Sequence, residues 1–240
     1  MARVAVLALL AALAVVPAAS ARMDTASRPS TGLRPEPADT FLVAHVRGSA
    51  PVPVHNRPFG RVLGRLSART DFGSRRAFAV VRSRRDRWLA VPAPELGNGR
   101  LGWIDARSAP LRFTRTSMEL RIDLSRRELV VREDGRALRR LRVGIGAPGT
   151  STPTGRFAVT DRLPGARFNV AYGCCILALS GRQPNLPPGW PGGDRLAIHG
   201  TPDGSRIGGA ASNGCLEAAE SDLRYLMRRV PLGTQVVIHP

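Results

Sequence analysis

One histidine and one cysteine stand sixteen positions apart near the end of the chain, in the stretch HGTPDGSRIGGAASNGCLE at residues 199–217. Glycines and small polar residues fill the space between them. A cysteine becomes a useful nucleophile when a base lies within reach, because a free thiol with a pKa of about 8.5 is mostly protonated at neutral pH. This pair predicts acyl transfer through a thioester, with Cys215 as nucleophile and His199 as base.

A tight turn of Ser212, Asn213 and Gly214 leads into Cys215. Glycine lets backbone N–H groups in such a turn converge, and convergent donors stabilise the oxyanion of a tetrahedral intermediate. Taken singly, His199 is better explained as a hydrogen-bonded histidine at a strand end, and Cys215 as a buried residue or half of a disulfide. Taken together with the turn, they favour an enzyme. No zinc site is expected, because neither C-x-x-C nor H-x-x-x-H spacing occurs. No cofactor is implied.

Three motifs in order give the C-terminal half a close resemblance to the L,D-transpeptidase catalytic domain, the YkuD-type fold. They are VGIGAPGTSTPTGRFAVTD with its G-x-x-x-x-P-T-G-x-F pattern, AIHGT…SNGC around the histidine and cysteine, and LGTQVVI near the C-terminus. The resemblance covers residues 118–239. It implies a β-sandwich-like domain that cross-links or trims peptidoglycan stem peptides. In this family the cysteine attacks the carbonyl of the third residue, a diaminopimelate, of a tetrapeptide donor, and D-alanine is released.

The resemblance implies a role for each matching residue. Cys215 is the nucleophile, His199 is the proton donor and acceptor, and a carbapenem-type β-lactam would acylate Cys215. The residues that lend backbone donors to the oxyanion or shape the site are Asn213, Gly214, Cys215, Ser212 and Gly200.

The chain departs from the family at two positions. Asn213 stands where the family often has histidine, a change we expect to be tolerated because His199 supplies the base. Glu217 stands where the family usually has arginine or asparagine. Three interpretations of Glu217 are open: it alters the acceptor preference, it pairs with an arginine such as Arg206, or it marks a weakened or inactive relative.

Two further cysteines, Cys174 and Cys175, are adjacent on an expected strand. Strand side chains alternate between faces, so at most one of the two would face a pocket. They are interpreted as small buried residues or as one reversible bridge, and a bridge from either to Cys215 would block catalysis. With three cysteines, at least one thiol is left over in an oxidising compartment.

The first 21 residues predict a cleaved secretory signal, with Arg3 before a thirteen-residue apolar run and small residues at 19–21. A membrane anchor is the competing interpretation, but the run is shorter than the ~20 residues that span a bilayer. Residues 22–40 are rich in Pro, Ser and Thr and predict a linker. We therefore expect a protein exported to the cell wall or periplasm, with no stable membrane span.

The 240 residues suit one or two domains, and the net charge of +18 comes from arginine alone among the basic residues. The arginines are scattered and few aromatic residues accompany them, so nucleic-acid binding is not expected. The charge is interpreted as a compositional bias of a solvated surface, with attraction to anionic wall polymers as an additional effect.

Short apolar runs from Phe41 onward, such as FLVAHV and RWLAV, alternate with turn-forming clusters and predict a small all-β unit. Residues 41–107 resemble a bacterial SH3-like domain. Trp88 and Trp103 would pack the core of its barrel or line a peptide groove. Residues 108–116 are predicted to be a connector to the catalytic domain at 117–239.

The catalytic half is also predicted to be mainly β, with one helix after the cysteine. Alternating apolar residues at 120–124 predict a strand, and residues 133–135 fit a hairpin turn. A brief strand at 196–198 would end at His199. After Cys215 the apolar spacing becomes helical, with acidic residues in the first turn and arginines in the last. The apolar residues at this spacing are Leu223, Leu226, Met227 and Val230.

Three functions are compared. The sequence favours a peptidoglycan L,D-transpeptidase that forms wall cross-links. The alternatives are an L,D-carboxypeptidase that uses water as acceptor, and a non-catalytic wall-binding protein with a degenerate site.

Overall fold

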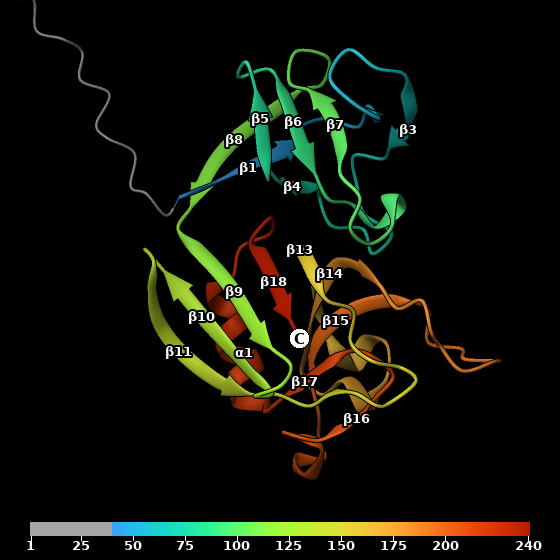
Figure 1. The fold of residues 1–240 in the computed structure, drawn as a ribbon, viewed down its shortest axis with the longest axis vertical. Coiled ribbons are helices and arrows are strands. Elements are labelled where there is room, and N and C mark those ends of the chain that lie inside the picture. Colours follow the sequence, from blue (N-terminus) through green and yellow to red (C-terminus); the bar gives the residue numbers. More distant parts are fainter. Residues whose placement is uncertain (1–39) are drawn as a thin grey trace, which may run out of the picture. The chain divides into compact units, whose positions relative to one another are not determined.

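The computed structural model describes residues 40–240, which belong to one compact unit (Figure 1). The expected signal sequence at 1–21 and all but the last residue of the expected linker at 22–40 lie outside the described residues. Within the described range, no helix combines the length and apolar character needed for a membrane span.

The N-terminal β unit, defined here as residues 41–116, contains eight strands in two sheets. One sheet has the order β3-β2-β7-β6-β5 and the other the order β4-β1-β8. The strands are β1 (Phe41–Val46), β2 (Val52–His55), β3 (Val62–Leu66), β4 (Ala77–Ala79), β5 (Arg82–Arg84), β6 (Trp88–Val91), β7 (Gly102–Asp105) and β8 (Leu111–Thr116). Apolar residues of both sheets, such as Phe78, Leu89 and Ile104, form its core.

Of the two tryptophans, Trp88 is buried and Trp103 is half-buried. Trp88 packs edge-on against His55 and Phe59, with ring centroids 5.0 and 5.1 Å away. Trp88 therefore has a packing role.

The expectation of a connector at 108–116 is wrong for most of that stretch. β8 (Leu111–Thr116) pairs antiparallel with β1 over six residues, from Phe41 opposite Thr116 to Val46 opposite Leu111. The strand lies at the edge of its sheet, and none of its residues is buried. A strand that buries little has a weak hydrophobic alternation, which explains why its sequence resembles a loop.

The second half, residues 117–239, is called the catalytic half here because the sequence predicts that role. It is built on an eight-stranded sheet with the order β11-β10-β9-β18-β13-β14-β15-β17, beside a small parallel pair of β12 and β16. Its strands are β9 (Met118–Asp123), β10 (Glu128–Glu133), β11 (Arg136–Arg142), β12 (Ile145–Gly146), β13 (Gly155–Pro164), β14 (Cys175–Arg182), β15 (Arg195–Gly200), β16 (Ala210–Ser212), β17 (Leu216–Ala218) and β18 (Gln235–His239). The expected hairpin forms between β10 and β11, with Asp134 and Gly135 at positive φ.

One α-helix, α1 (Glu220–Arg229), occurs among residues 40–240, at the position that the helical spacing predicted. Glu220 and Asp222 lie in its first turn and Arg228 and Arg229 in its last turn, which is the charge order that the helix dipole favours. The helix contacts β14 and β15.

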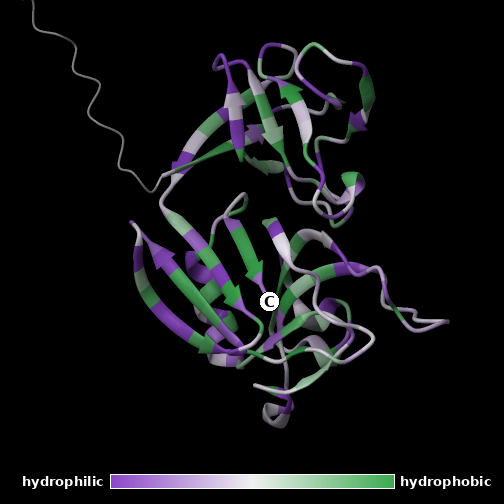
Figure 2. Ribbon diagram, in the orientation of Figure 1, coloured by the Kyte–Doolittle hydropathy of each residue, from purple (hydrophilic) through white to green (hydrophobic). Residues whose placement is uncertain are grey.

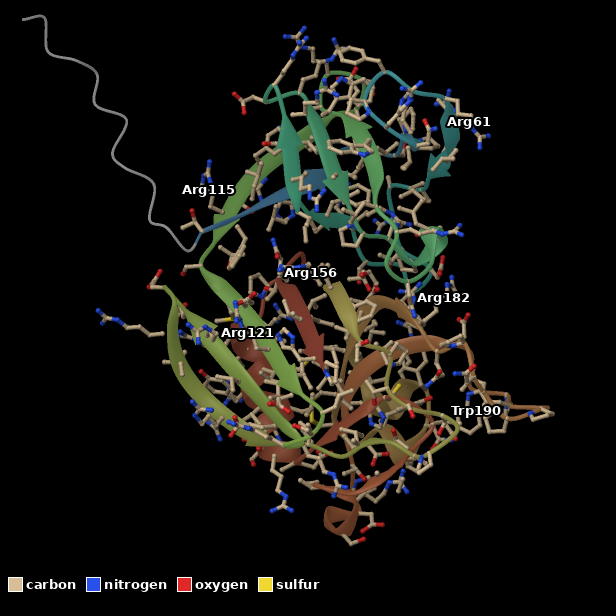
Figure 3. All side chains as sticks on the ribbon, viewed as in Figure 1. Arg61, Arg115, Arg121, Arg156, Arg182 and Trp190 are labelled. Atoms are coloured by element: carbon tan, nitrogen blue, oxygen red, sulfur yellow. A yellow bond between two sulfur atoms is a disulfide. The ribbon has the colours of Figure 1, made fainter. Side chains whose placement is uncertain are left out.

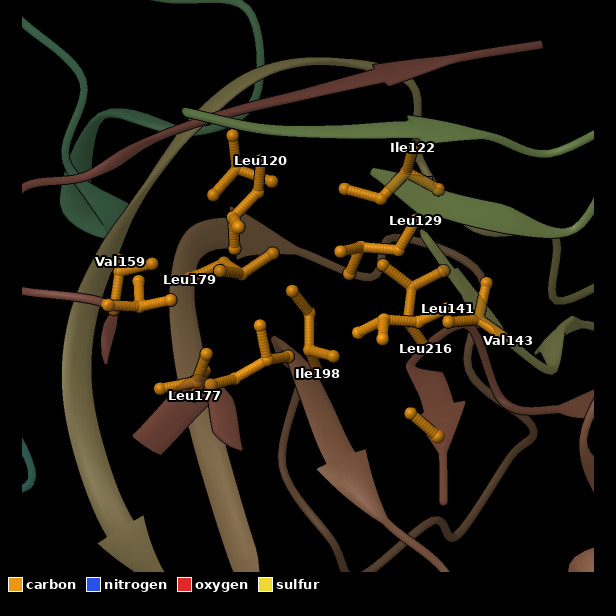
Figure 4. Close-up of a cluster of buried hydrophobic side chains, with 14 of the residues drawn as sticks. Leu120, Ile122, Leu129, Leu141, Val143, Val159, Leu177, Leu179, Ile198 and Leu216 are labelled. Atoms are coloured by element: carbon orange, nitrogen blue, oxygen red, sulfur yellow. The ribbon is translucent and has the colours of Figure 1, made fainter. Parts of the chain in front are cut away.

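The core of the catalytic half lies where α1 and the strands of the large sheet meet. Figure 4 shows part of it, including Leu120 and Ile122. Leu120 and Ile122 of β9 are fully buried, as are Leu223 and Leu226 of α1. Figure 2 shows the middle of β18 as hydrophobic, whereas β10 and β11 alternate between hydrophobic and hydrophilic residues. The fold is therefore mainly β, as predicted.

Candidate active site

Two neighbouring parallel strands carry the candidate nucleophile and base. In the register of β15 and β17, Ile198 lies opposite Leu216 and His199 lies opposite Glu217. Cys215 directly precedes Leu216, so it lies beside Ala197. Since side chains alternate along a strand, Cys215, Glu217 and His199 point to one face of this pair. All three line a single cavity of about 810 Å³.

The thiol of Cys215 is free and half-buried. Its Sγ lies 3.9 Å from the backbone carbonyl oxygen of Arg195, at the start of β15. Burial raises the pKa of the Cys215 thiol to about 11; a hydrogen bond from the Ala197 backbone lowers this pKa and the charge of Glu217 raises it. The thiol is therefore protonated at neutral pH until a base removes its proton.

His199 is held in the form that a general base requires. Its Nδ1 lies 2.7 Å from the carbonyl oxygen of Gly200. A carbonyl oxygen only accepts hydrogen bonds, so Nδ1 carries the proton and Nε2 keeps a lone pair. Burial lowers the pKa of His199, against the opposing effects of the Gly200 carbonyl and the Glu217 charge. Tyr172 packs edge-on against the imidazole, with ring centroids 4.9 Å apart.

The turn before the cysteine is fixed by its own side chains. The hydroxyl of Ser212 donates to the Cys215 carbonyl at 2.6 Å and accepts from the Gly214 amide at 3.1 Å. Gly214 has φ of 109°, and a Cβ there would lie 1.9 Å from Nε2 of Gln183. Gln183 in turn donates to the carbonyl oxygens of Thr150 and Ser151. Asn213 lines the cavity.

Position 200 has no room for a side chain. A Cβ at Gly200 would lie 2.4 Å from Oε1 of Glu220. The Glu220 carboxylate accepts hydrogen bonds from the Cys174 amide at 2.9 and 3.0 Å. Gly200 therefore lets the first residue of α1 approach the loop before β14 while its own carbonyl holds His199.

The Glu217 carboxylate forms an ion pair with Arg206, which is one of the three interpretations considered for it. Nε and Nη2 of Arg206 lie 2.8–3.1 Å from the Glu217 oxygens. The Glu217 side chain is 7% exposed and that of Arg206 is 35% exposed. Hydrogen bonding to Glu217 raises the pKa of Arg206. The pair thus presents a fixed, partly exposed guanidinium to the cavity.

Cys174 and Cys175 form a disulfide with each other and not with Cys215. Cys175 is buried in the main core of the catalytic half and Cys174 packs against that core. Neither lines the cavity.

Most of the cavity lining was not identified from the sequence, and this part includes Tyr172, Gln183, Trp190 and Arg195. Trp190 is on the loop after β14 (Figure 3). Each stands alone in a segment without a motif, so no spacing pattern marked it as a site residue. The proline- and glycine-rich stretch QPNLPPGWPGGD does indicate an irregular loop beside the predicted site strand.

Comparison with known proteins identifies the family. The model of the YkuD L,D-transpeptidase catalytic domain matches residues 117–238. This match covers half of the chain, and the chain belongs to that family.

Two relatives illustrate the match. "Putative L,D-transpeptidase YkuD" of Bacillus licheniformis is 31% identical over 119 residues, covering 50% of this chain and 64% of the relative. "Probable L,D-transpeptidase ErfK/SrfK" of Salmonella typhimurium is 32% identical over 111 residues, covering 41% of this chain and 36% of the relative. The matches therefore span less than two thirds of either relative.

Among solved structures, an L,D-transpeptidase from Mycobacterium smegmatis aligns over 67% of this chain and 81% of its own, with 14% identity and a TM-score of 0.43. L,D-transpeptidase 3 from Mycobacterium tuberculosis, in complex with a faropenem-derived adduct, aligns over 58% of this chain and 73% of its own, with 15% identity and a TM-score of 0.40.

Proposed function

We propose that this protein is an exported peptidoglycan L,D-transpeptidase that uses Cys215 for acyl transfer from a tetrapeptide stem. The observation that supports it best is the placement of a free thiol and a neutral imidazole on one face of β15 and β17, in one cavity. Membership of the L,D-transpeptidase family supports the reaction class.

In the first half-reaction, Nε2 of His199 takes the Sγ proton as sulfur attacks the carbonyl carbon of the third stem residue. The backbone amides of Asn213 and Cys215 stabilise the oxyanion, and the Gly214 amide, which is bonded to Ser212, holds the turn in shape. When the intermediate collapses, the C–N bond breaks and protonated His199 gives its proton to the departing D-alanine amine. A thioester on Cys215 remains.

In the second half-reaction, an amine of a neighbouring stem peptide attacks the thioester. His199 takes the amine proton, the C–S bond breaks, and the proton returns to sulfur. The products are a new amide cross-link and free Cys215.

The ion pair of Arg206 and Glu217 has a role in substrate binding in this proposal. Stem peptides carry carboxylates, and a guanidinium binds a carboxylate through paired hydrogen bonds. The buried Glu217 carboxylate orients Arg206, whose exposed part faces the cavity. Arg206 would thereby supply the positive charge that other members of the family obtain where they have arginine at the position of Glu217.

The segments outside the catalytic domain have supporting roles. The proposal places the protein in the cell wall or periplasm, after removal of a signal sequence at 1–21. The N-terminal β unit would act as an SH3-like module that holds wall polymer.

The test is incubation of the mature protein with a disaccharide-tetrapeptide, followed by mass spectrometry. We expect D-alanine release and a cross-linked dimer, and Cys215→Ala should abolish both. Tripeptide without dimer would identify a carboxypeptidase. Unchanged substrate, together with no mass shift after exposure to a carbapenem, would contradict an enzymatic function and favour a wall-binding protein.

A further inference from the structure

A short loop of the N-terminal β unit, residues 70–72, reaches the catalytic half beside the cavity. Thr70 Oγ1 donates a hydrogen bond to Asp161 Oδ1 of β13. Asp161 is fully buried, and its Oδ2 lies 3.9 Å from Nη1 of Arg195. The loop therefore meets β13 at a buried carboxylate and, next to it, the arginine that begins β15.

Asp71 holds that arginine directly. Its Oδ2 accepts a hydrogen bond from Nη2 of Arg195 at 2.7 Å. The Arg195 side chain is only 10% exposed and also donates to Thr160 Oγ1 at 3.3 Å. The backbone carbonyl of the same arginine accepts from the Cys215 thiol. Arg195 is thus in contact with both Asp71 and the Cys215 thiol, and it links the two.

Phe72 forms the apolar part of the same contact. The Arg195 guanidinium lies 5.2 Å from the centre of its ring. The ring also meets Phe168, which lines the cavity, edge-on at 5.7 Å. Phe72 packs on a small buried cluster of the catalytic half, on which Tyr172 and Cys215 also pack; the cluster residues are Leu163, Ile176 and Ala197.

We propose that the 70–72 loop completes the active site from the N-terminal β unit, with Asp71 and Phe72 as positioning residues for β15 and the Cys215 thiol. This inference rests on the proposed function and deepens it, since it makes the N-terminal β unit a part of the catalytic apparatus as well as a wall-binding module. The inference is based on two kinds of contact that the loop makes near the thiol. Its polar side chains bind Arg195 and Asp161, and Phe72 packs on the cluster that also contacts Cys215.

Another contact between the two halves provides a matched control. Val43 of β1 packs against Gly233, which precedes β18 and does not line the cavity. Val43→Ala removes a contact between the halves of the chain without touching Arg195 or the cluster. It therefore separates a general loosening of the two halves from a specific effect on Cys215.

The experiment uses the full mature chain carrying Asp71→Ala, Phe72→Ala or Val43→Ala. Cys215 is the single free thiol of the chain, so alkylation by iodoacetamide, followed by intact mass, reports on it alone. We expect Phe72→Ala to admit water to the cluster and move the alkylation profile to lower pH. In both loop variants, acylation by a carbapenem should slow by about tenfold or more, because a small displacement of a reacting group is costly.

Phe72→Leu should restore much of the wild-type profile, because it refills the apolar contact. Val43→Ala should keep the wild-type profile and acylation rate even where its melting temperature falls. The inference is overturned if Asp71→Ala and Phe72→Ala behave like Val43→Ala in both assays. Alkylation requires only the thiol, so its profile tests the loop even if wild-type protein fails to form the transpeptidase products.

Discussion

At the scale of the residue, Cys215 and His199 of the candidate site are two neutral groups rather than a thiolate–imidazolium pair. Burial raises the pKa of Cys215 to about 11 and lowers the pKa of His199. Both shifts disfavour a thiolate–imidazolium pair in the resting protein. In the proposed reaction, proton transfer would therefore accompany attack on the substrate, with the lone pair on Nε2 of His199 as the acceptor.

This charge state predicts the pH dependence of thiol reactivity. Because only the thiolate is alkylated, the rate at Cys215 should rise continuously from neutral to alkaline pH as the thiol approaches its raised pKa. The measurement is the rate of iodoacetamide addition by intact mass across that range, with Cys215→Ala as the blank. A plateau already reached at neutral pH would indicate a preformed thiolate and contradict the neutral pair.

The candidate site residues could be proposed from the sequence because they lie in short local motifs. His199, Cys215 and the turn at 212–214 are close in the chain and have distinctive types. The partners that tune them were not predictable in this way: Tyr172 and Gln183 reach the site only through tertiary packing. For Glu217, the sequence left three interpretations open, and pairing with an arginine such as Arg206 was one of them. The structure shows that this ion pair forms.

At the scale of the element, the candidate active site depends on the parallel strands β15 and β17 and on the constrained turn that leads from β16 into β17. β15 delivers His199 and β17 begins directly after Cys215, so the turn at 212–214 sets where sulfur lies relative to the imidazole. Hydrogen bonds of Ser212 and the left-handed backbone of Gly214 hold this turn.

Gly214→Ala tests the turn. The new Cβ would meet the Gln183 amide at 1.9 Å and would strain a backbone at φ of 109°. We expect acylation by a carbapenem to fall by about tenfold or more, as for other small displacements of reacting groups. Circular dichroism should show that the strands persist. Wild-type acylation by Gly214→Ala would mean that the turn does not position the thiol.

The strands and helix that bury one clear face were predictable from periodicity, and they include the β10–β11 hairpin and α1. Strand β8 was not, because an exposed edge strand buries too little to leave a hydrophobic pattern. The bond between Cys174 and Cys175 was likewise one of two alternatives, since adjacent cysteines do not reveal their oxidation state.

At the scale of the whole molecule, stability depends on the core where α1 and the large sheet meet. Arginines that carry the net charge are spread over both halves, including Arg61, Arg121 and Arg182 (Figure 3). Such a dispersed charge favours solubility and attraction to polyanions, but it adds little to folding.

Leu120→Ala measures the contribution of this core. Leu120 is fully buried on β9 among the residues of Figure 4. Truncation should lower the free energy of unfolding by about 2–5 kcal/mol, the range for a large-to-small change in a packed core. Urea unfolding followed by circular dichroism gives this value, with Leu138→Ala on exposed β11 as the control. Equal losses for the two variants would show that the core is misassigned.

The mutual bond of Cys174 and Cys175 has a practical consequence. Each molecule exposes one reducing sulfur to reagents, and that sulfur is the proposed nucleophile. Titration of free thiols in a preparation, without added reductant, would therefore give the molar concentration of protein molecules with an unmodified Cys215.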